Sequence, residues 1–281
     1  MKTVRICSIA SGSNGNAYYI EYGEEAILVD AGISAKQILK RATQRKIDIN
    51  RVKAVFVSHE HSDHVRGLHV LCDRLNIPAY MTRGTAEGMR TYYMPKNPPI
   101  RIDVDGITCI GDMKVHSFSK PHDVIEPCSF RVECGDINIG VFTDIGCSCE
   151  GLMENLSKCH VAFLESNYDE EMLRAGKYPA QLKQRILSDK GHLSNAQAAD
   201  IVRAVDAPCL HTLILSHLSA DNNRPQIALK AFAEFADRIN ITTASRYEAG
   251  EVFTVTTETS ETPQTKIVFP ERLDRAAVNF N

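Results

Sequence analysis

Histidine and aspartate side chains crowd a short segment that begins where a β-branched run ends. The stretch Val55-Phe56-Val57-Ser58-His59-Glu60-His61-Ser62-Asp63-His64 holds three imidazoles and the carboxylate of Asp63 within six residues. Neutral imidazole and carboxylate groups bind zinc, manganese or iron more readily than calcium or magnesium. At the end of a strand, His59 and His61 can converge on one point, and Asp63 and His64 at the next helix start can face a second. The segment therefore predicts a metal centre.

Three further side chains of the same kind follow apolar runs elsewhere in the chain. His122 comes after the run 114–118, Asp144 ends the run 137–143, and His217 comes directly after the run 212–216. Each alone would be an ordinary loop residue. Because all three share the same context as the first cluster, we expect them to meet it at one edge of a sheet.

The elements that must position these side chains alternate between short β runs and helices. Alternation and turn residues predict strands at 4–10, 17–21, 26–30, 54–58, 100–104, 107–110, 114–118, 129–134, 137–143, 161–165, 212–216, 240–245, 251–257 and 266–269. Cap residues and periodicity predict helices at 34–46, 62–76, 169–187, 194–205 and 225–238. Strands in both halves with helices between them predict two packed sheets flanked by helices. We expect one domain over residues 1–270 and a tail over 271–281.

Composition narrows the class of protein. The 281 residues are 43% hydrophobic and 24% charged, which is ordinary for a globular fold. The first ten residues show no secretory signal, and no apolar run reaches the roughly 18 residues that span a membrane. Nine cysteines without a repeated spacing indicate reduced thiols and a cytoplasmic protein; we expect Cys147 and Cys149 to be buried. The sequence points to no obligate protein partner and leaves a homo-oligomer open.

The charge balance bears on the substrate. The net charge is −3 and the pI is about 6.4, whereas a protein that grips many phosphates usually carries a basic surface. A nucleic-acid substrate would therefore need a local positive potential, partly supplied by bound metal ions.

The segment His59-Glu60-His61-Ser62-Asp63-His64 matches the HxHxDH motif of the metallo-β-lactamase superfamily, and Asp30 matches the aspartate that precedes it there. The resemblance extends to about residue 255. It implies an α+β fold, a four-layered αβ/βα sandwich of two mixed β-sheets flanked by helices, with the metals at one sheet edge.

The resemblance also implies a ligand set for two divalent ions, Zn²⁺ or Mn²⁺, with Fe possible. One ion is held by three histidines and the other by a carboxylate and two histidines; these are His59, His61 and His122 for the first, and Asp63, His64 and His217 for the second. Asp144 bridges the two ions, and Asp30 orients one of the ligands without binding an ion itself.

Four segments narrow the resemblance further. Residues 11–16, 164–169, 191–195 and 216–219 resemble the WalJ/YycJ-like branch of the superfamily, described as metal-dependent 5′-to-3′ DNA exonucleases. This implies a phosphodiesterase with DNA as its substrate. Glu165 and the segment 191–194 also resemble the RNase Z enzymes, but the long RNA-binding arm of those enzymes is not evident here.

The expected chemistry is hydrolysis at phosphorus. Two metal ions a few ångströms apart lower the pKa of a shared water, and the resulting metal-bridging hydroxide attacks the phosphodiester. We assign catalytic roles to His192, Glu165 and Asp63, with His192 held by Glu165 as proton donor to the leaving alkoxide. The alternative for His192 is a loop histidine ahead of a helix cap.

Two other segments are open to two interpretations each. The loop 11–16, through Ser13 and Asn14, either cradles a phosphate or is a plain strand turn. The segment 169–192 either forms a substrate wall, with Tyr168 and Tyr178 stacking on bases, or is a charge-mixed solvated helix.

Two other functions compete with the exonuclease. One is a hydrolase of small phosphodiesters or other small esters on the same metal site, which the acidic pI favours. The other is a non-catalytic metal-binding protein that kept the scaffold; the intact ligand set argues against it.

Overall fold

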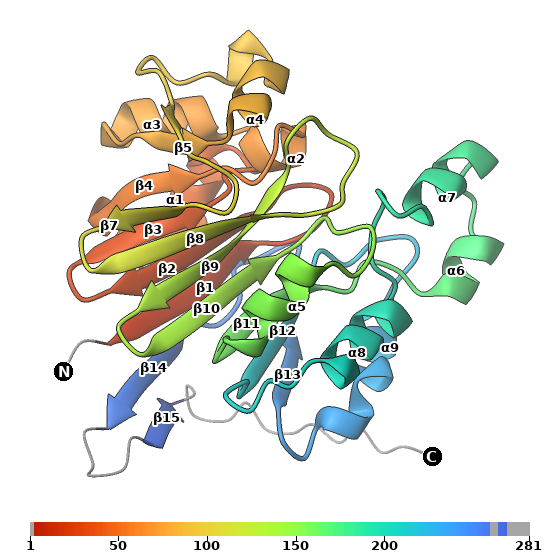
Figure 1. Ribbon diagram of the computed structural model, residues 1–281. Coiled ribbons are helices and arrows are strands. Elements are labelled where there is room, and N and C mark those ends of the chain that lie inside the picture. The colour runs from red at the N-terminus through yellow and green to blue at the C-terminus, as the bar shows by residue number, and fades with distance from the viewer. Residues whose placement is uncertain (1–2, 259–263, 269–281) are drawn as a thin grey trace.

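Two mixed β-sheets pack face to face in the computed structural model, which describes residues 3–258 and 264–268 (Figure 1). The first sheet has the order β15-β14-β1-β2-β3-β4-β5-β6. Its strands are β1 (Val4–Ala10), β2 (Ala17–Tyr22), β3 (Glu25–Val29), β4 (Val52–Phe56), β5 (Ala79–Met81), β6 (Ile100–Arg101), β14 (Phe253–Glu258) and β15 (Gln264–Val268). From β3 to β6 neighbouring strands are parallel, so their carboxyl ends share one edge.

The second sheet has the order β13-β12-β11-β10-β9-β8-β7. Its strands are β7 (Ile107–Ile110), β8 (Met113–Ser119), β9 (Cys128–Cys134), β10 (Ile137–Phe142), β11 (Val161–Glu165), β12 (Thr212–Ser216) and β13 (Asn240–Thr243). Strands β7 to β10 form an antiparallel meander, and β10 to β13 run parallel.

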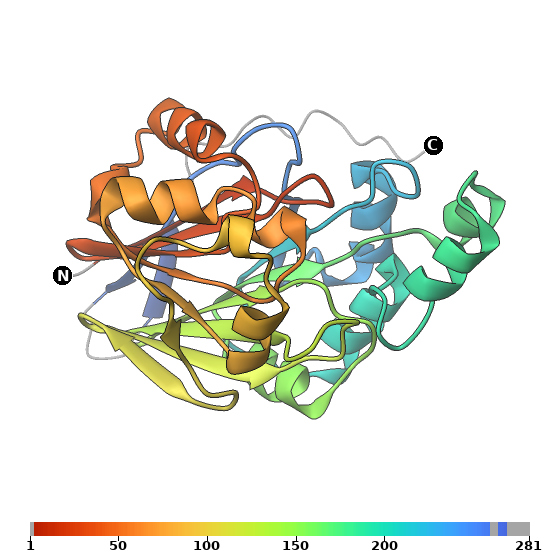
Figure 2. The same ribbon diagram turned by 90° about the horizontal axis from the view of Figure 1, so that it is seen from above.

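Helices cover the outer faces of both sheets, which gives four layers (Figures 1 and 2). The helices are α1 (Ala35–Gln44), α2 (Ser62–Val65), α3 (Leu68–Leu75), α4 (Arg83–Gly88), α5 (Glu150–Ser157), α6 (Glu170–Ala175), α7 (Ala180–Ile186), α8 (Asn195–Ala204) and α9 (Pro225–Ala231), with 3-10 turns at Ile49–Arg51, Thr91–Tyr93 and Ala233–Phe235. Helices α6 and α7 project from the side of the sandwich.

Alternation along β1 shows how the layers are held. Val4 and Ile6 face the core between the sheets, where they join Phe56 and Phe130. Ile9, on the other face, joins the core under α1 and α3. A third apolar cluster lies between the second sheet and helices α5, α8 and α9. A strand buried on both faces reads as a nearly continuous apolar run, as these strands do in the sequence.

Helix caps fall where the sequence predicts them. Ser34 caps α1 by accepting a hydrogen bond from the backbone N–H of Gln37. Ser194 and Gln197 form the reciprocal capping box at the start of α8. These caps fix the first turn of each helix next to the loops that lead to it.

Three predicted helices were wrong in extent. The helix predicted at 62–76 is two helices, α2 and α3, separated at Gly67. The helix predicted at 169–187 is likewise α6 and α7, with Gly176 and Pro179 between them. The helix predicted at 225–238 stops at Ala231 and continues as a 3-10 turn. In the first two cases, glycine and proline favour the break because they destabilise a helix interior.

Several smaller differences complete the comparison. Strand β5 and helices α4 and α5 are not among the elements predicted from the sequence. Phe269, expected in the last strand, and the tail expected over 271–281 lie outside the described residues, so the domain limits stay a prediction. Cys147 and Cys149 are partly exposed rather than buried; all nine cysteines are free. Within the described ranges, no helix has the length and apolar character needed to cross a membrane.

Candidate metal centre

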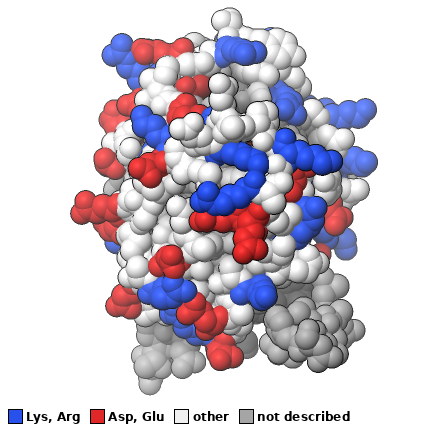
Figure 3. Space-filling model, turned by 90° about the vertical axis from the view of Figure 1, so that its right-hand side faces the viewer, with Lys and Arg blue, Asp and Glu red and all other residues white. Residues whose placement is uncertain are grey.

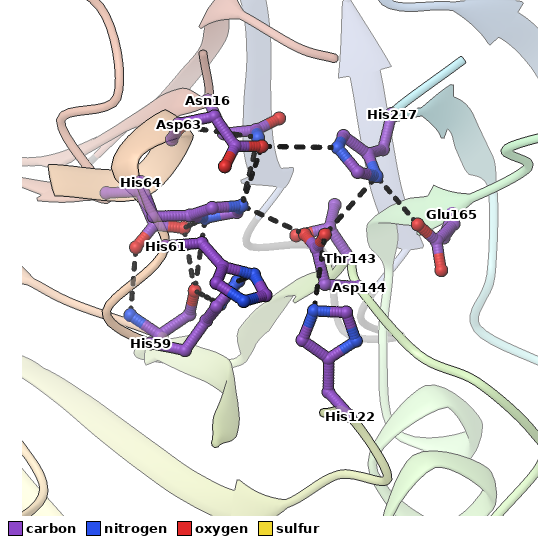
Figure 4. Close-up of polar contacts among 12 residues, drawn as sticks. Asn16, His59, His61, Asp63, His64, His122, Thr143, Asp144, Glu165 and His217 are labelled. Carbon is purple, nitrogen blue, oxygen red and sulfur yellow. Dashed lines mark hydrogen bonds and ion pairs between the residues drawn. The ribbon is translucent and has the colours of Figure 1, made fainter. Parts of the chain in front are cut away.

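The predicted ligands gather at one edge of the two sheets, in segments that follow strands of both sheets (Figure 4). Asp30 directly follows β3, the segment containing His59 to His64 follows β4, and Asp144 and His217 follow β10 and β12. Asp30, Asp144 and His217 adopt left-handed backbone conformations, with φ of 61°, 57° and 57°. Asp and His are among the few residues other than glycine that tolerate this region, and it turns each side chain toward the common edge.

One group of donor atoms comes from three histidines. The ligand atoms of His59, His61 and His122 all lie within 4.8 Å of one another. His59 Nε2 is 3.2 Å from His61 Nδ1, a separation that suits two ligands of one ion as well as a hydrogen bond. The structure thus brings His122, which is 61 residues beyond His61 in the chain, into one group with His59 and His61.

A second group adjoins the first and contains Asp63, His64, Asp144 and His217, again within 4.8 Å. Asp144 Oδ2 is 3.2 Å from His64 Nε2, and its Oδ1 is 3.5 Å from His217 Nδ1 and 3.9 Å from His122 Nε2. Asp144 therefore belongs to the second group and also reaches the first, through its Oδ1.

Buried polar atoms without partners show that this site suits a cation. His122 Nε2, His217 Nε2 and Asp144 Oδ2 are buried and make no hydrogen bond within the described part of the chain, and the nearest contact of Asp144 Oδ2 is its ion pair with His64. Leaving such atoms unsatisfied costs about 1–3 kcal/mol each. Divalent ions bound in the two groups would satisfy all three, and the imidazole and carboxylate donors fit zinc, manganese or iron.

Neighbouring side chains hold the donors in position. Asp30 is fully buried and its Oδ2 accepts a hydrogen bond of 2.7 Å from His64 Nδ1. The same carboxylate also accepts from the backbone N–H and hydroxyl of Ser58, whose oxygen lies 2.9 Å from His59 Nδ1. His122 Nδ1 lies 3.1 Å from the carbonyl oxygen of Gly191. Each contact occupies one ring nitrogen and leaves the other to face the cation site.

The pKa values divide the histidines into two sets. Burial lowers the pKa of His122 to about 4, helped by the neighbouring Lys120, and burial likewise lowers the pKa of His59 and His61. Burial opposes the charged form of His217 too, but Asp144 and Asp63 outweigh it and raise its pKa to about 10.

In the second group, the histidine pKa values are raised and the carboxyl pKa values are lowered. Burial disfavours the charged form of His64, yet Asp144 and Asp30 hold its pKa well above the usual range. Burial also opposes ionisation of Asp63 and Asp144, but the adjacent imidazoliums keep the pKa of both carboxyls low. The first group is thus neutral and ready for a metal, whereas the second holds protons that a metal would displace.

Glu165, the last residue of β11, links the predicted proton donor to this site. Its Oε1 accepts from His192 Nδ1 at 2.9 Å and from His217 Nδ1 at 2.7 Å. Its Oε2 accepts from the backbone N–H groups of Ile145 and Leu193. Burial would raise the pKa of Glu165, but His192 and His217 lower it to about 2. His192 retains 17% exposure of its side chain, so it borders both the site and solvent.

The loop 11–16 lies against the same edge, but through residues other than those predicted. Ser13 and Asn14 are exposed, and Asn14 bonds to Arg246 rather than toward the metal ligands. Asn16 is the residue that faces the site, with Nδ2 3.1 Å from His64 Nε2. Ser11 Oγ accepts a hydrogen bond from the backbone N–H of His217.

Asp123 was also missed, although it directly follows His122. Its Oδ1 is 3.4 Å from His122 Nε2, and its Oδ2 accepts from Arg185 of α7 at 2.5 Å. Proximity in sequence to a predicted ligand was the signal available for this residue.

The segment 169–192 was open to two interpretations, a substrate wall with stacking tyrosines and a charge-mixed solvated helix, and it shows features of both. Tyr168 is 2% exposed and packs with Leu173 and Ile186, so its predicted stacking on bases is wrong. Tyr178 is partly exposed and donates a hydrogen bond to Asp221. The face of the molecule on the α6 and α7 side carries interspersed basic and acidic side chains (Figure 3).

Comparisons with known proteins agree with this geometry. Residues 10–187 match the Metallo-beta-lactamase superfamily. The chain is 36% identical over 222 residues to Exodeoxyribonuclease YycJ of Bacillus anthracis, covering 78% of this chain and 84% of that protein. The chain belongs to the metallo-β-lactamase superfamily. This metallo-β-lactamase-fold chain is also 33% identical over 228 residues to Exodeoxyribonuclease WalJ of Streptococcus pneumoniae, covering 78% of this chain and 83% of that one.

A solved structure extends the agreement on the fold. The metallo-beta-lactamase fold protein YhfI from Bacillus subtilis superposes with a TM-score of 0.68 at 17% identity, over 89% of this chain and 99% of that one. The predicted family, WalJ/YycJ-like branch and sandwich architecture are confirmed. This metallo-β-lactamase superfamily member is a hydrolase whose His and Asp clusters imply a divalent metal.

Proposed function

We propose that this hydrolase is a 5′-to-3′ DNA exonuclease that works with two divalent ions. The observation that supports it most is the pair of adjoining donor groups that meet at Asp144, with three buried donor atoms that make no hydrogen bond within the described residues. Similarity to two proteins named exodeoxyribonucleases supports DNA as the substrate.

In this proposal each donor group binds one ion. His59, His61 and His122 hold the first, and Asp63, His64 and His217 hold the second, with Asp144 shared. When bound, such a pair of ions lowers the pKa of a water and offsets the charge of the phosphate. The chain's own contribution is to fix the donors through Asp30, Ser58 and Glu165 before any ion arrives.

His192 supplies the proton for the leaving oxygen. Its Nδ1 is engaged by Glu165, so Nε2 is the nitrogen available to carry the proton outward. An alkoxide is a poor leaving group, and a positioned imidazole can donate a proton to it as the bond to phosphorus breaks. Glu165 keeps the His192 ring oriented and also fixes His217, so one carboxylate positions both the proton donor and a metal ligand.

A second activity has one observation in its favour. The net charge of −3 and the mixed charges beside α6 and α7 resemble the surface of an enzyme for small phosphodiesters or other small esters more than that of a nuclease.

The test compares duplex DNA with bis-p-nitrophenyl phosphate, each supplied with zinc or manganese. DNA carrying a 5′-phosphate and a label at either end separates the two polarities: we expect labelled mononucleotides to appear first from the 5′-labelled strand. Turnover of DNA should fall steeply with salt and turnover of the small ester should not. Hydrolysis of the ester alone would overturn the nuclease proposal in favour of the second activity.

A further inference from the structure

A pocket next to the metal centre is not used by the proposed reaction. Its volume is about 350 Å³, and its walls include Ser11, Ser219, Arg224, Arg246 and Tyr247. It lies between the loop that follows β1, the segment after β12, and the turn that follows β13. Pockets of this size commonly bind small organic groups.

Two shared backbone segments connect the pocket to the metal site. Ser11 lines the pocket and accepts the hydrogen bond from the backbone N–H of His217. Leu218 and Ser219, which also line it, directly follow His217 in the chain. A substrate phosphate at the metal centre is therefore next to any group held in the pocket.

The arginines of the pocket have no acidic partners within the described residues. Arg224 Nη1 donates only to the carbonyls of Ala220 and Asn223. Arg246 Nε donates to Asn14 Oδ1, and its Nη1 is buried without any hydrogen bond in the described structure. By contrast, Arg83, Arg185 and Arg203 are each paired with a carboxylate. Unneutralised guanidinium groups with free donors suit a phosphate.

Tyr247 offers an aromatic surface in the same pocket. The residue is 76% exposed, and the Arg246 guanidinium lies over its ring, 5.8 Å from the ring centroid. Its backbone is held by hydrogen bonds from Arg41 Nη2 to its carbonyl and from its N–H to Ser245 Oγ. An aromatic ring on a fixed backbone, beside cationic groups, can stack on a nucleobase at low entropic cost.

We propose that this pocket binds one nucleotide of the substrate strand, next to the one whose phosphodiester is cut. Arg246 and Arg224 hold the phosphate of that nucleotide, and Tyr247 stacks on its base. The assignment rests on the proposed nuclease function for its role in catalysis, but the binding of a nucleotide is a separate property.

Binding is measured first, by calorimetry on the metal-loaded full chain. The probes are 2′-deoxyadenosine 5′-monophosphate, deoxyadenosine and inorganic phosphate. We expect the nucleotide to bind at least about tenfold more tightly than either part, and Arg246→Ala, Arg224→Ala or Tyr247→Ala to weaken it about 5- to 100-fold. Tyr247→Phe should bind normally, because it keeps the ring.

The matched control is Arg83→Ala, which removes one positive charge from α4, outside the pocket, and should bind like the parent chain. Arg246 also bonds to the loop 11–16, so Arg224→Ala and Tyr247→Ala keep the test valid if Arg246→Ala folds poorly. Equal nucleotide affinity in all three variants and the parent would overturn the proposal.

Kinetics then assign the nucleotide to the substrate strand. We expect the three variants to raise KM for DNA at least about fivefold relative to Arg83→Ala. Weaker nucleotide binding with unchanged KM for DNA would overturn the strand assignment and leave a site for free nucleotide. If the parent chain cuts no DNA at all, the nuclease proposal fails, while the calorimetry still decides whether the pocket binds a nucleotide.

Discussion

Glu165 joins two histidines that have different proposed tasks. His217 is a proposed metal ligand and His192 a proposed proton donor, yet both Nδ1 atoms meet the same carboxylate oxygen. Because this carboxylate is fully buried and receives two backbone hydrogen bonds, it has little freedom to move. The orientation of the donor is therefore tied to that of the metal site.

Removing the imidazole of His192 should separate catalysis from metal binding. His192→Ala should lower the rate of hydrolysis by about 10²–10⁴, the usual contribution of a general acid, while metal content stays at the parent level. The measurements are turnover of bis-p-nitrophenyl phosphate and elemental analysis. A loss of metal in this variant would show that His192 acts as a ligand or a structural residue instead.

The protons held by the second donor group predict a pH dependence. The pKa of His64 is raised and that of His217 is raised to about 10, above the ordinary value of 6.5. In the metal-free chain, the stability from these imidazoliums is fully present below about pH 6.5 and is lost as pH rises toward 10. Metal affinity should change in the opposite direction, because each bound ion must displace protons.

Calorimetric titration of metal in two buffers with different ionisation heats will count these protons. We expect release of about one proton from each of the two histidines near neutral pH, with affinity increasing as the pH rises toward the His217 pKa of about 10. An identical binding heat in both buffers would contradict the proton-displacement account.

The sequence was most informative about single residues with strong chemical preferences. His59 to His64 are recognisable as a dense cluster, and His122, Asp144 and His217 because each follows an apolar run in the same way as that cluster. Asn16 faces the site, but its amide resembles those of many turns. The left-handed backbone at Asp144 and His217 depends on tertiary contacts and has no local signal.

At the level of elements, close backbone packing positions the metal-binding segment. A Cβ added at Gly32 would lie 1.6 Å from the carbonyl oxygen of Asp63 and 2.6 Å from the backbone nitrogen of Asn16. The loop after β3 therefore touches both α2 and the loop 11–16, which is possible only without a side chain. Gly67, at the break between α2 and α3, approaches the carbonyl of Ile33 in the same way.

Gly32→Ala should accordingly disturb both the fold and the metal site. We expect a loss of about 1–3 kcal/mol or more in the free energy of unfolding, because the backbone of Asp63 must shift, together with reduced metal content. Urea unfolding and elemental analysis measure the two effects. Gly250→Ala is the control, since its Cβ would come no nearer than 3.6 Å to Ser8; equal effects in both variants would refute the packing argument.

Element prediction succeeded where periodicity and caps agree and failed where packing decides. Strands β1, β11 and β12 and the capped helix α8 follow from local patterns. The division of 62–76 into two helices follows from the contact of Gly67 with Ile33, which joins distant segments. Strand β5 is three residues long and pairs in parallel with β4, so it has little periodicity to detect.

For the whole molecule, the metal centre fastens the two sheets to each other. His59, His61, Asp63 and His64 follow the first sheet's β4, whereas His122, Asp144 and His217 belong to loops of the second sheet. A ligand that binds only the folded chain stabilises it by about 2.7 kcal/mol at a hundredfold excess over Kd.

Metal should therefore raise the melting temperature by about 5–10 °C in the parent chain. His61→Ala and Asp144→Ala should each lose most of this rise, show reduced metal content and have no hydrolytic activity. Scanning calorimetry with chelator and with added zinc or manganese provides the measurement. Full metal-induced stabilisation in either variant would remove that residue from the proposed ligand set.

The architecture as a whole was predictable because strand clusters in both halves and the HxHxDH motif agree. How the two sheets pack against each other could not be derived from the spacing of residues in the sequence. It depends on contacts in the core between the sheets, such as that between Phe56 and Phe130.

The distribution of ligands over both sheets also has a consequence for biosynthesis. A ribosome makes His59 to His64 early, but the last proposed ligand, His217, emerges about 150 residues later. The second donor group is incomplete until β12 has been translated and has inserted beside β11. A nascent or prematurely terminated chain that lacks this strand would therefore be inert, which would spare the cell from an unfinished hydrolase.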